Sequence, residues 1–265
     1  MKSLRRLFTR PKPEGRTEAP PQFRGGLPSP DEGFVAIGDV HGCAEALAAL
    51  WDKLAKAAPG MTIIHVGDYI DRGEDSAGVL RMLHERQAHD GDIVCLKGNH
   101  EEMFLDFLRE PEEKGERWLR YGGLQTLQSF GDLSLGKALP ERDFVRIRDG
   151  LIQQLGEAMI GFLATMPRYW RSGNVAVVHA GADPREPLDR QRPASLTWGH
   201  PAFGELPRSD GLWIVHGHTV VDMPIMANGV ISIDTGAYAK GRLTAAIIRP
   251  GREVEFLQAA SQRQG

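Results

Sequence analysis

Five loops of this chain carry aspartate, asparagine or histidine beside glycine, and these side chains could bind metal ions. Their sequences are Gly38-Asp39-Val40-His41-Gly42, Gly67-Asp68-Tyr69-Ile70-Asp71-Arg72-Gly73, Gly98-Asn99-His100-Glu101, His179-Ala180-Gly181 and Gly217-His218-Thr219. Oxygen and imidazole ligands without cysteine suit manganese, iron or zinc better than calcium or a thiolate-bound metal. One such loop is weak evidence, since Gly-Asp and Gly-Asn are common turn dipeptides. Five in one chain favour a shared metal site.

Each loop follows a short apolar segment with the composition of a buried strand. The first three segments are residues 34–37, 63–66 and 93–96, and apolar residues recur at helical spacing after each loop. Three successive strand–loop–helix units predict a largely parallel sheet with right-handed crossovers. The carboxyl ends of such strands are where open α/β sheets place their chemistry. In extended backbone Asp39 and His41 point to the same side, so both can reach one ion.

The second half of the chain predicts further helices and strands. Between about residues 111 and 167, apolar residues occur at spacings of three and four, which is typical of helices. The later apolar segments that predict strands are residues 175–178, 212–215, 230–233, 243–248 and 254–257. The last two are expected to be antiparallel or edge strands. We therefore predict an α/β fold with two packed sheets, helices outside them and a helical insertion at about 111–167.

Charge is distributed unevenly along the chain. Residues 1–30 contain seven basic and two acidic residues, a net charge of +5, and the whole chain carries −3, which leaves −8 for the rest. An acidic body argues against nucleic-acid binding. The arm at residues 1–32 is also rich in proline, which favours a disordered tail over a docking segment built on Leu4, Leu7 and Phe8. The predicted division is this arm, one domain at 33–259 and a tail at 260–265.

The sequence offers no membrane or export signal. No apolar segment approaches the ~18 residues of a transmembrane helix. No apolar region of the kind found in signal peptides follows the basic residues at the amino terminus. The two cysteines, Cys43 and Cys95, have neither metal-type nor disulfide-type spacing. We expect a cytoplasmic protein whose thiols are reduced and buried.

The five loops resemble the motif series of the calcineurin-like metallophosphoesterases. Within that group, they are most similar to the phosphoprotein phosphatases and their bacterial and phage serine/threonine members. The resemblance extends over residues 34–248, nearly the whole domain. It implies a two-sheet β-sandwich flanked by helices and the metal-dependent hydrolysis of phosphate esters.

By this resemblance, six side chains hold two divalent ions, and Asp68 bridges them. The first ion is held by Asp39, His41 and Asp68, and the second by Asp68, Asn99, His179 and His218. The Gly-His-Thr pattern matches at His218 rather than at His216. Val220 stands where the wider superfamily often has a further ligand histidine, so the first ion keeps three protein ligands. Manganese is the expected metal, with iron and zinc as alternatives.

The implied reaction is in-line attack on phosphorus by a hydroxide that bridges the two ions, without a phosphoenzyme. Metal binding lowers the pKa of water toward about 7. His100 then protonates the leaving oxygen, while Asp71 orients the imidazole and favours its cationic form. Arg72 holds the phosphate oxygens as a fork.

Several residues receive lesser or open assignments. Many relatives place a second phosphate-binding arginine two residues after a tryptophan, where this chain has His200, so either His200 or Arg208 is expected to substitute. Tyr238 resembles a site tyrosine of some relatives and is assigned a minor substrate contact. Glu101 either orients a neighbouring group or is explained by the dipole of the following helix, which favours an acid in the first turn. Aromatic residues that line either a substrate edge or the core are Trp118, Tyr121 and Trp170.

The favoured function is phosphomonoester hydrolysis by a serine/threonine protein phosphatase, acting on a phosphoprotein or a small phosphoester. The alternative is a symmetrical dinucleoside tetraphosphate hydrolase, a sister enzyme that usually has alanine at the Asp71 position and aspartate at the Glu101 position. Both residues of this chain therefore favour the phosphatase. A non-catalytic phosphate-binding scaffold is a third possibility, but it predicts lost ligands, and all six are present.

Overall fold

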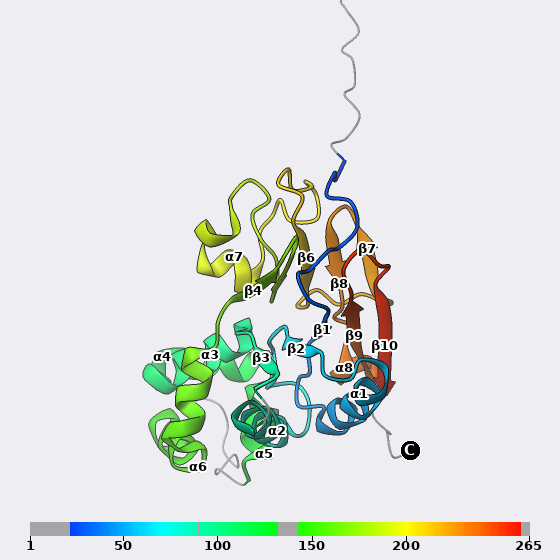
Figure 1. Cartoon of the computed structure of the whole chain (residues 1–265). Coiled ribbons are helices and arrows are strands. Elements are labelled where there is room, and N and C mark those ends of the chain that lie inside the picture. Colours follow the sequence, from blue (N-terminus) through cyan, green and yellow to red (C-terminus); the bar gives the residue numbers. More distant parts are fainter. Residues whose placement is uncertain (1–21, 90, 132–142, 261–265) are drawn as a thin grey trace, which may run out of the picture.

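The computed structural model describes residues 22–89, 91–131 and 143–260 and contains two five-stranded sheets (Figure 1). The first sheet has the strand order β10-β9-β1-β2-β3. Its strands are β1 (Phe34–Ile37), β2 (Thr62–His65), β3 (Ile93–Cys95), β9 (Arg242–Ile248) and β10 (Glu255–Ala260). Strands β1, β2 and β3 are parallel, whereas β9 pairs antiparallel with both β1 and β10. The three strand–loop–helix units thus form the parallel half of this sheet, as the sequence predicts.

The second sheet has the strand order β4-β5-β6-β8-β7. Its strands are β4 (Tyr169–Ser172), β5 (Val175–Val178), β6 (Trp213–His216), β7 (Ile225–Ala227) and β8 (Val230–Ser232). Strands β5, β6 and β8 are parallel, and the two edge strands are antiparallel to their neighbours. Both sheets therefore end several parallel strands in loops that can contribute to one site.

Helices cover the outer faces of the two sheets (Figure 1). The α-helices are α1 (Ala44–Ala57), α2 (Ser76–His89), α3 (Asn99–Arg109), α4 (Pro111–Trp118), α5 (Leu124–Ser129), α6 (Phe144–Thr165), α7 (Pro193–Trp198) and α8 (Ala237–Lys240). A π-helical turn, η1 (Leu119–Gly123), joins α4 to α5, and a short 3-10 helix, η3 (Leu188–Arg190), precedes α7. None of the helices in the described part of the chain is long and apolar enough to cross a membrane.

Side chains that point alternately to the two faces of each strand divide the core into layers. In β1, Phe34 and Ala36 belong to the cluster between the sheets, where they join side chains such as Val177 and Val215. Val35 and Ile37 face the opposite way and pack with the helices on the first sheet. Successive side chains of a strand point to opposite faces, so one four-residue apolar strand supplies both layers. The predicted fold, two packed sheets flanked by helices, is confirmed.

Part of the proline-rich arm lies against the second sheet. The ring of Phe23 packs edge-on against Trp213 with 4.8 Å between ring centroids. The indole N–H of Trp213 donates to the carbonyl of Gly26, and the amide of Asn174 donates to the carbonyls of Gly25 and Leu27. Residues 22–30 thus pack on the domain, whereas residues 1–21, with the basic cluster of the arm, lie outside the described residues.

Candidate metal centre

Loops from both sheets bring the six candidate ligands together. Asp39 and His41 follow β1, Asp68 follows β2, and Asn99 opens α3 after β3, while His179 and His218 follow β5 and β6. A continuous series of contacts joins the six residues. The distances are 3.5 Å from His41 Nε2 to Asp68 Oδ2, 3.3 Å from Asp68 Oδ1 to His179 Nε2, 2.9 Å from His179 Nε2 to Asn99 Oδ1, 2.9 Å from Asn99 Oδ1 to His218 Nδ1, and 3.0 Å from the His218 backbone nitrogen to Asp39 Oδ2.

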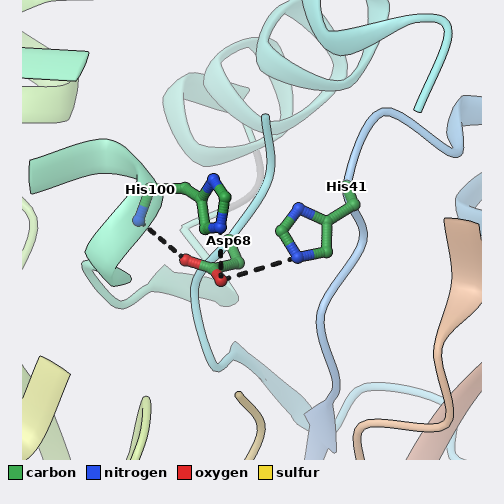
Figure 2. Close-up of side chains that lie close together, drawn as sticks. All are labelled: His41, Asp68 and His100. Atoms are coloured by element: carbon green, nitrogen blue, oxygen red, sulfur yellow. Dashed lines mark hydrogen bonds and ion pairs between the residues drawn. The ribbon is translucent and has the colours of Figure 1, made fainter. Parts of the chain in front are cut away.

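Asp68 lies between the two halves of this cluster. Its Oδ2 faces the Nε2 atoms of His41 and His100 at 3.5 and 3.8 Å (Figure 2). Its Oδ1 faces His179 Nε2 and also accepts the backbone N–H of His100 at 3.1 Å. The carboxylate thus presents one oxygen to His41 and the other to His179, which is one of the arrangements in which a carboxylate can bridge two ions.

Backbone carbonyls fix the orientation of two of the candidate ligand histidines. Nδ1 of His41 lies 2.7 Å from the carbonyl of Ile70, and Nδ1 of His179 lies 3.2 Å from that of Val66. A carbonyl can only accept, so each ring is assigned its proton on Nδ1 and turns an unprotonated Nε2 toward Asp68. Such partners behind the imidazole are typical of metal-ligating histidines.

The electrostatics of the donor set fit two cations. Burial lowers the pKa of His41 to about 3 and that of His218 to about 4, so both rings are neutral, the form that binds metal. Burial also lowers the pKa of His179, but the charge of Asp68, its hydrogen bond and the charge of Glu101 together outweigh burial, so the net shift is upward. With its proton on Nδ1, the ring of His179 turns Nε2 toward oxygen atoms of Asn99 and Asp68 at 2.9 and 3.3 Å, and either a proton or a metal ion between these atoms relieves the repulsion of their lone pairs.

Buried carboxylates add negative charge to the same place. Burial, Asp234 and Asp68 together raise the pKa of Asp39 well above its usual range, and burial followed by the charge of Asp68 raises that of Asp234. Burial would also raise the pKa of Asp68, but His179 and His100 hold it well below its usual range. Divalent ions offset such a concentration of negative charge, so the residues fit a dinuclear site. The sequence shows Asp234 at the end of an apolar run, yet it receives no role there.

Asp71 holds His100 through a short buried contact. Asp71 Oδ2 lies 2.7 Å from Nδ1 of His100, and both side chains are fully buried. Asp71 also accepts the indole N–H of Trp118 at 3.1 Å and the hydroxyl of Thr126 at 2.7 Å. Burial lowers the pKa of His100, but Asp68 and Asp71 more than offset it, so the pKa is raised. Nε2 of His100 has no hydrogen-bond partner among the described residues and faces Asp68, where it can donate to a substrate oxygen.

Arg72 lies beside the candidate ligands. Its Nη1 is 3.2 Å from Nε2 of His41, and its guanidinium carbon is 5.1 Å from the ring centroid of Tyr238. The ring of Tyr238 meets that of His41 edge-on at 5.2 Å. Arg72 and Tyr238 are both half-buried, so the guanidinium can reach a phosphate at the metal centre.

The two candidates for a second phosphate-binding group make contacts elsewhere. Nε2 of His200 lies 3.5 Å from Asp183. Arg208 donates to the backbone carbonyls of Asp183 and Glu186 at 2.9 Å and forms an ion pair with Asp210. Arg208 is 7% exposed and its guanidinium is engaged in holding this loop, so its contacts do not connect it to the six candidate ligands.

Glu101 has a role that the helix dipole alone does not predict. Its carboxylate accepts the backbone N–H groups of Asp68, Tyr69 and Gly98 at 2.8 to 2.9 Å. Burial and the nearby Asp68 raise the pKa of Glu101 to about 7. The residue therefore ties the loop after β2 to the start of α3. The sequence also gives no sign that Trp118 and Thr126 hydrogen-bond to Asp71, because nothing in their local sequence indicates a contact with a residue so distant in the chain.

The remaining histidine near the site is structural. Nε2 of His216 lies 2.8 Å from the hydroxyl of Ser232, and its Nδ1 lies 2.8 Å from the carbonyl of Gly217. Burial lowers its pKa to about 4. His216 thus joins β6 to β8 from a fully hydrogen-bonded position.

Comparison with known proteins shows that the sequence of this chain is similar to those of phosphoesterases. A family model described as calcineurin-like phosphoesterase matches residues 33–222. The asymmetrical bis(5'-nucleosyl)-tetraphosphatase PrpE of Bacillus velezensis is 27% identical over 235 residues, which cover 80% of this chain and 87% of that protein. The protein of the same name from Oceanobacillus iheyensis is 28% identical over 252 residues, or 86% of this chain and 92% of that protein.

The solved structures show the same architecture at lower identity. A serine/threonine phosphatase from Saccharomyces cerevisiae with similarity to human phosphatase PP5 has a TM-score of 0.56 and 15% identity, with coverage of 89% of this chain and 82% of that one. At this identity the likeness concerns the fold alone.

Proposed function

The chain belongs to the calcineurin-like phosphoesterase family, and from that premise we propose that it hydrolyses dinucleoside tetraphosphates at a phosphoanhydride bond. The observation that carries metal-dependent phosphate hydrolysis is the cluster of six candidate ligands on either side of Asp68. Nε2 of His100, which has no hydrogen-bond partner among the described residues, lies 3.8 Å from Asp68 and is the group assigned to protonate a leaving oxygen.

Each residue then has a defined task. Two divalent ions held by the six ligands would lower the pKa of bound water toward about 7 and offset phosphate charge. Arg72 binds the non-bridging phosphate oxygens, because its guanidinium reaches the edge of the ligand cluster. His100 donates its Nε2 proton to the bridging oxygen as the phosphorus–oxygen bond breaks, and Asp71 stabilises the cation before that transfer.

The choice of substrate rests on the relatives. Both relatives described above carry the name of an asymmetrical bis(5'-nucleosyl)-tetraphosphatase and align with 80% or more of this chain. Their name specifies asymmetrical cleavage, whereas the sequence-based alternative was a symmetrical hydrolase. The carboxylate of Glu101 accepts three backbone N–H groups, and this contact does not distinguish between the two substrates.

A second candidate function is hydrolysis of phosphomonoesters, including phosphoserine and phosphothreonine. The observation that favours it is the Asp71–His100 contact of 2.7 Å. A serine alkoxide leaves far less readily than a phosphate and needs a strong general acid, whereas cleavage of an anhydride depends less on one. The two functions use the same metal centre and differ in the leaving group.

The deciding experiment compares two substrates with one preparation. The protein loaded with Mn²⁺ is given diadenosine tetraphosphate and a phosphoserine peptide, with the Asp68→Asn variant as the control for contaminating phosphatases. We expect faster turnover of the dinucleotide and the products AMP and ATP. Faster turnover of the peptide would overturn the proposal, and two molecules of ADP would overturn asymmetrical cleavage.

A further inference from the structure

Tyr121 is an exposed aromatic side chain at the rim of the site. It lies in η1, and 46% of its surface is exposed, one of the largest values for an apolar or aromatic residue in the described chain. Its ring meets that of His100 edge-on, with 6.5 Å between centroids and an angle of 74°. An exposed ring so close to the proton donor is available to a substrate.

Contacts made by residues before and after Tyr121 in the sequence hold its position relative to His100. Three residues earlier, the buried Trp118 donates its indole N–H to Asp71, the partner of His100. One residue later, the carbonyl of Gly122 accepts the backbone N–H of Arg72 at 3.2 Å.

The absence of a side chain at Gly122 allows η1 to lie this close to the backbone of Arg72. Its φ is +109°, and a Cβ added there would lie 2.7 Å from the backbone nitrogen of Arg72. The position of the Tyr121 ring is therefore set by the same loop that carries Asp71 and Arg72.

Tyr238, the other tyrosine at the site, does not offer the same surface. Its ring lies under the guanidinium of Arg72 and against the edge of His41. Tyr121 makes no comparable cation contact in the described structure, and its ring remains open to solvent. An aromatic face of this kind can stack on a nucleobase, since every base has a π-face.

We propose that Tyr121 stacks on the base of the leaving nucleotide, and that this leaving group is a nucleoside monophosphate. The inference rests on the proposed function. His100 protonates the leaving oxygen, so the leaving group extends from the ring of His100. The centroid of the Tyr121 ring is 6.5 Å from that of His100, which is within the length of one nucleotide. In a nucleoside triphosphate leaving group, two further phosphates would separate the leaving oxygen from the base, so an extended chain would place the base beyond the ring of Tyr121.

The proposed step defines where each atom goes. The attacking water releases a proton to solvent as its oxygen bonds to the second phosphorus of the tetraphosphate chain, and the bond from that phosphorus to the bridging oxygen breaks. The bridging oxygen keeps the electron pair and takes the proton of His100, which gives the nucleoside monophosphate. The water oxygen remains on the terminal phosphate of the nucleoside triphosphate, and solvent restores the proton of His100.

Binding measurements test the stacking independently of turnover. Calorimetry on the Mn²⁺-loaded protein compares AMP with inorganic phosphate for the wild type and for Tyr121→Ala, Tyr121→Leu and Tyr121→Phe. Loss of one base–aromatic stack predicts that the Kd of AMP rises about 10-fold or more in the Ala variant, with inorganic phosphate unchanged. Phe should retain AMP binding, whereas Leu, which keeps apolar surface without a ring, should weaken it.

The contrary outcomes are distinct from failure of the proposed function. An unchanged Kd for AMP in Tyr121→Ala, or an equal loss for AMP and phosphate, would overturn the stacking. Failure to cleave diadenosine tetraphosphate would refute the proposed function without changing the AMP measurement. In an active preparation, hydrolysis in ¹⁸O-labelled water should place the label in ATP, and label in AMP would overturn the assignment of the leaving group.

Discussion

Replacing Asp71 with asparagine tests whether the carboxylate makes His100 an effective acid. Asp71 is fully buried, contacts Nδ1 of His100 at 2.7 Å, and also accepts hydrogen bonds from Trp118 and Thr126. Asparagine has nearly the same shape, but its amide has one oxygen. If that oxygen keeps Trp118 and Thr126, the NH₂ group faces His100, and the ring loses the charge that favours its cationic form.

The size of the effect follows from the contact that is lost. A buried hydrogen bond to a charged group contributes about 1.5–3 kcal/mol. Since about 1.4 kcal/mol corresponds to a factor of ten in rate, the variant should be slowed about 10- to 150-fold where proton donation limits the reaction. The loss should appear with a poor leaving group and be small with a good one.

The assay measures kcat for phenyl phosphate and para-nitrophenyl phosphate at saturating Mn²⁺, together with metal content and Tm. We expect the full slowing with phenyl phosphate and at most about a threefold change with para-nitrophenyl phosphate, whose leaving group needs little protonation. The exposed Asp106, paired with Arg109 on α3, supplies the control variant Asp106→Asn. Equal slowing of both substrates with normal metal content would refute the role of Asp71 in acid catalysis.

Three further substitutions test other parts of the site. Asp68→Asn should abolish turnover and reduce metal loading, measured by elemental analysis; two bound ions with normal activity would contradict a bridging role. Glu101→Gln leaves a backbone N–H without its acceptor and should lower the free energy of unfolding in urea by about 1–3 kcal/mol, together with weaker Mn²⁺ binding; wild-type stability would refute its role in joining the loops. Arg208→Ala should lower Tm without changing KM, because the guanidinium bonds to two carbonyls and Asp210; a raised KM at unchanged Tm would place Arg208 at the substrate instead.

The sequence predicts that the candidate ligands cluster because of a property of parallel strands. Apolar segments that end in Asp39, Asp68 and Asn99 belong to β1, β2 and β3, which are adjacent and parallel. Their carboxyl ends therefore meet at one edge, and strand-end positions alone indicate that these side chains converge. His179 and His218 obey the same rule in the second sheet, where β5 and β6 are parallel neighbours.

The supports of these ligands could not be predicted in the same way. Thr126 and Trp118 reach Asp71 across 55 and 47 residues of sequence, and no periodicity indicates which turn of a helix will meet a loop. The placement of Arg208 fails for a related reason: a basic residue in a loop after α7 is equally suited to phosphate or to backbone carbonyls. Only the packing of that loop directs its guanidinium to Asp183 and Glu186.

Backbone conformation explains why the loops need these supports. Six non-glycine residues of the described chain have positive φ angles, and five of them lie at the site: His41, Asp68, Asp71, Arg72 and His218. The left-handed conformation costs an L-residue about 1–2 kcal/mol, so the loops would relax if nothing held them. The hydrogen bonds from the backbone N–H groups of Asp68, Tyr69 and Gly98 to the Glu101 carboxylate oppose that relaxation.

Glycine residues in these loops allow neighbouring loops to pack closely against one another, which further restrains the backbone. A Cβ on Gly98 would lie 2.1 Å from Oδ1 of Asp68, and a Cβ on Gly73 would lie 1.9 Å from the carbonyl oxygen of His41. The glycines beside the ligands therefore serve the contact between loops as well as the turns within them. Strain at the candidate ligand residues, the hydrogen bonds of the Glu101 carboxylate and the bare glycine backbones together hold the donor atoms in place, which would limit the reorganisation that metal binding requires.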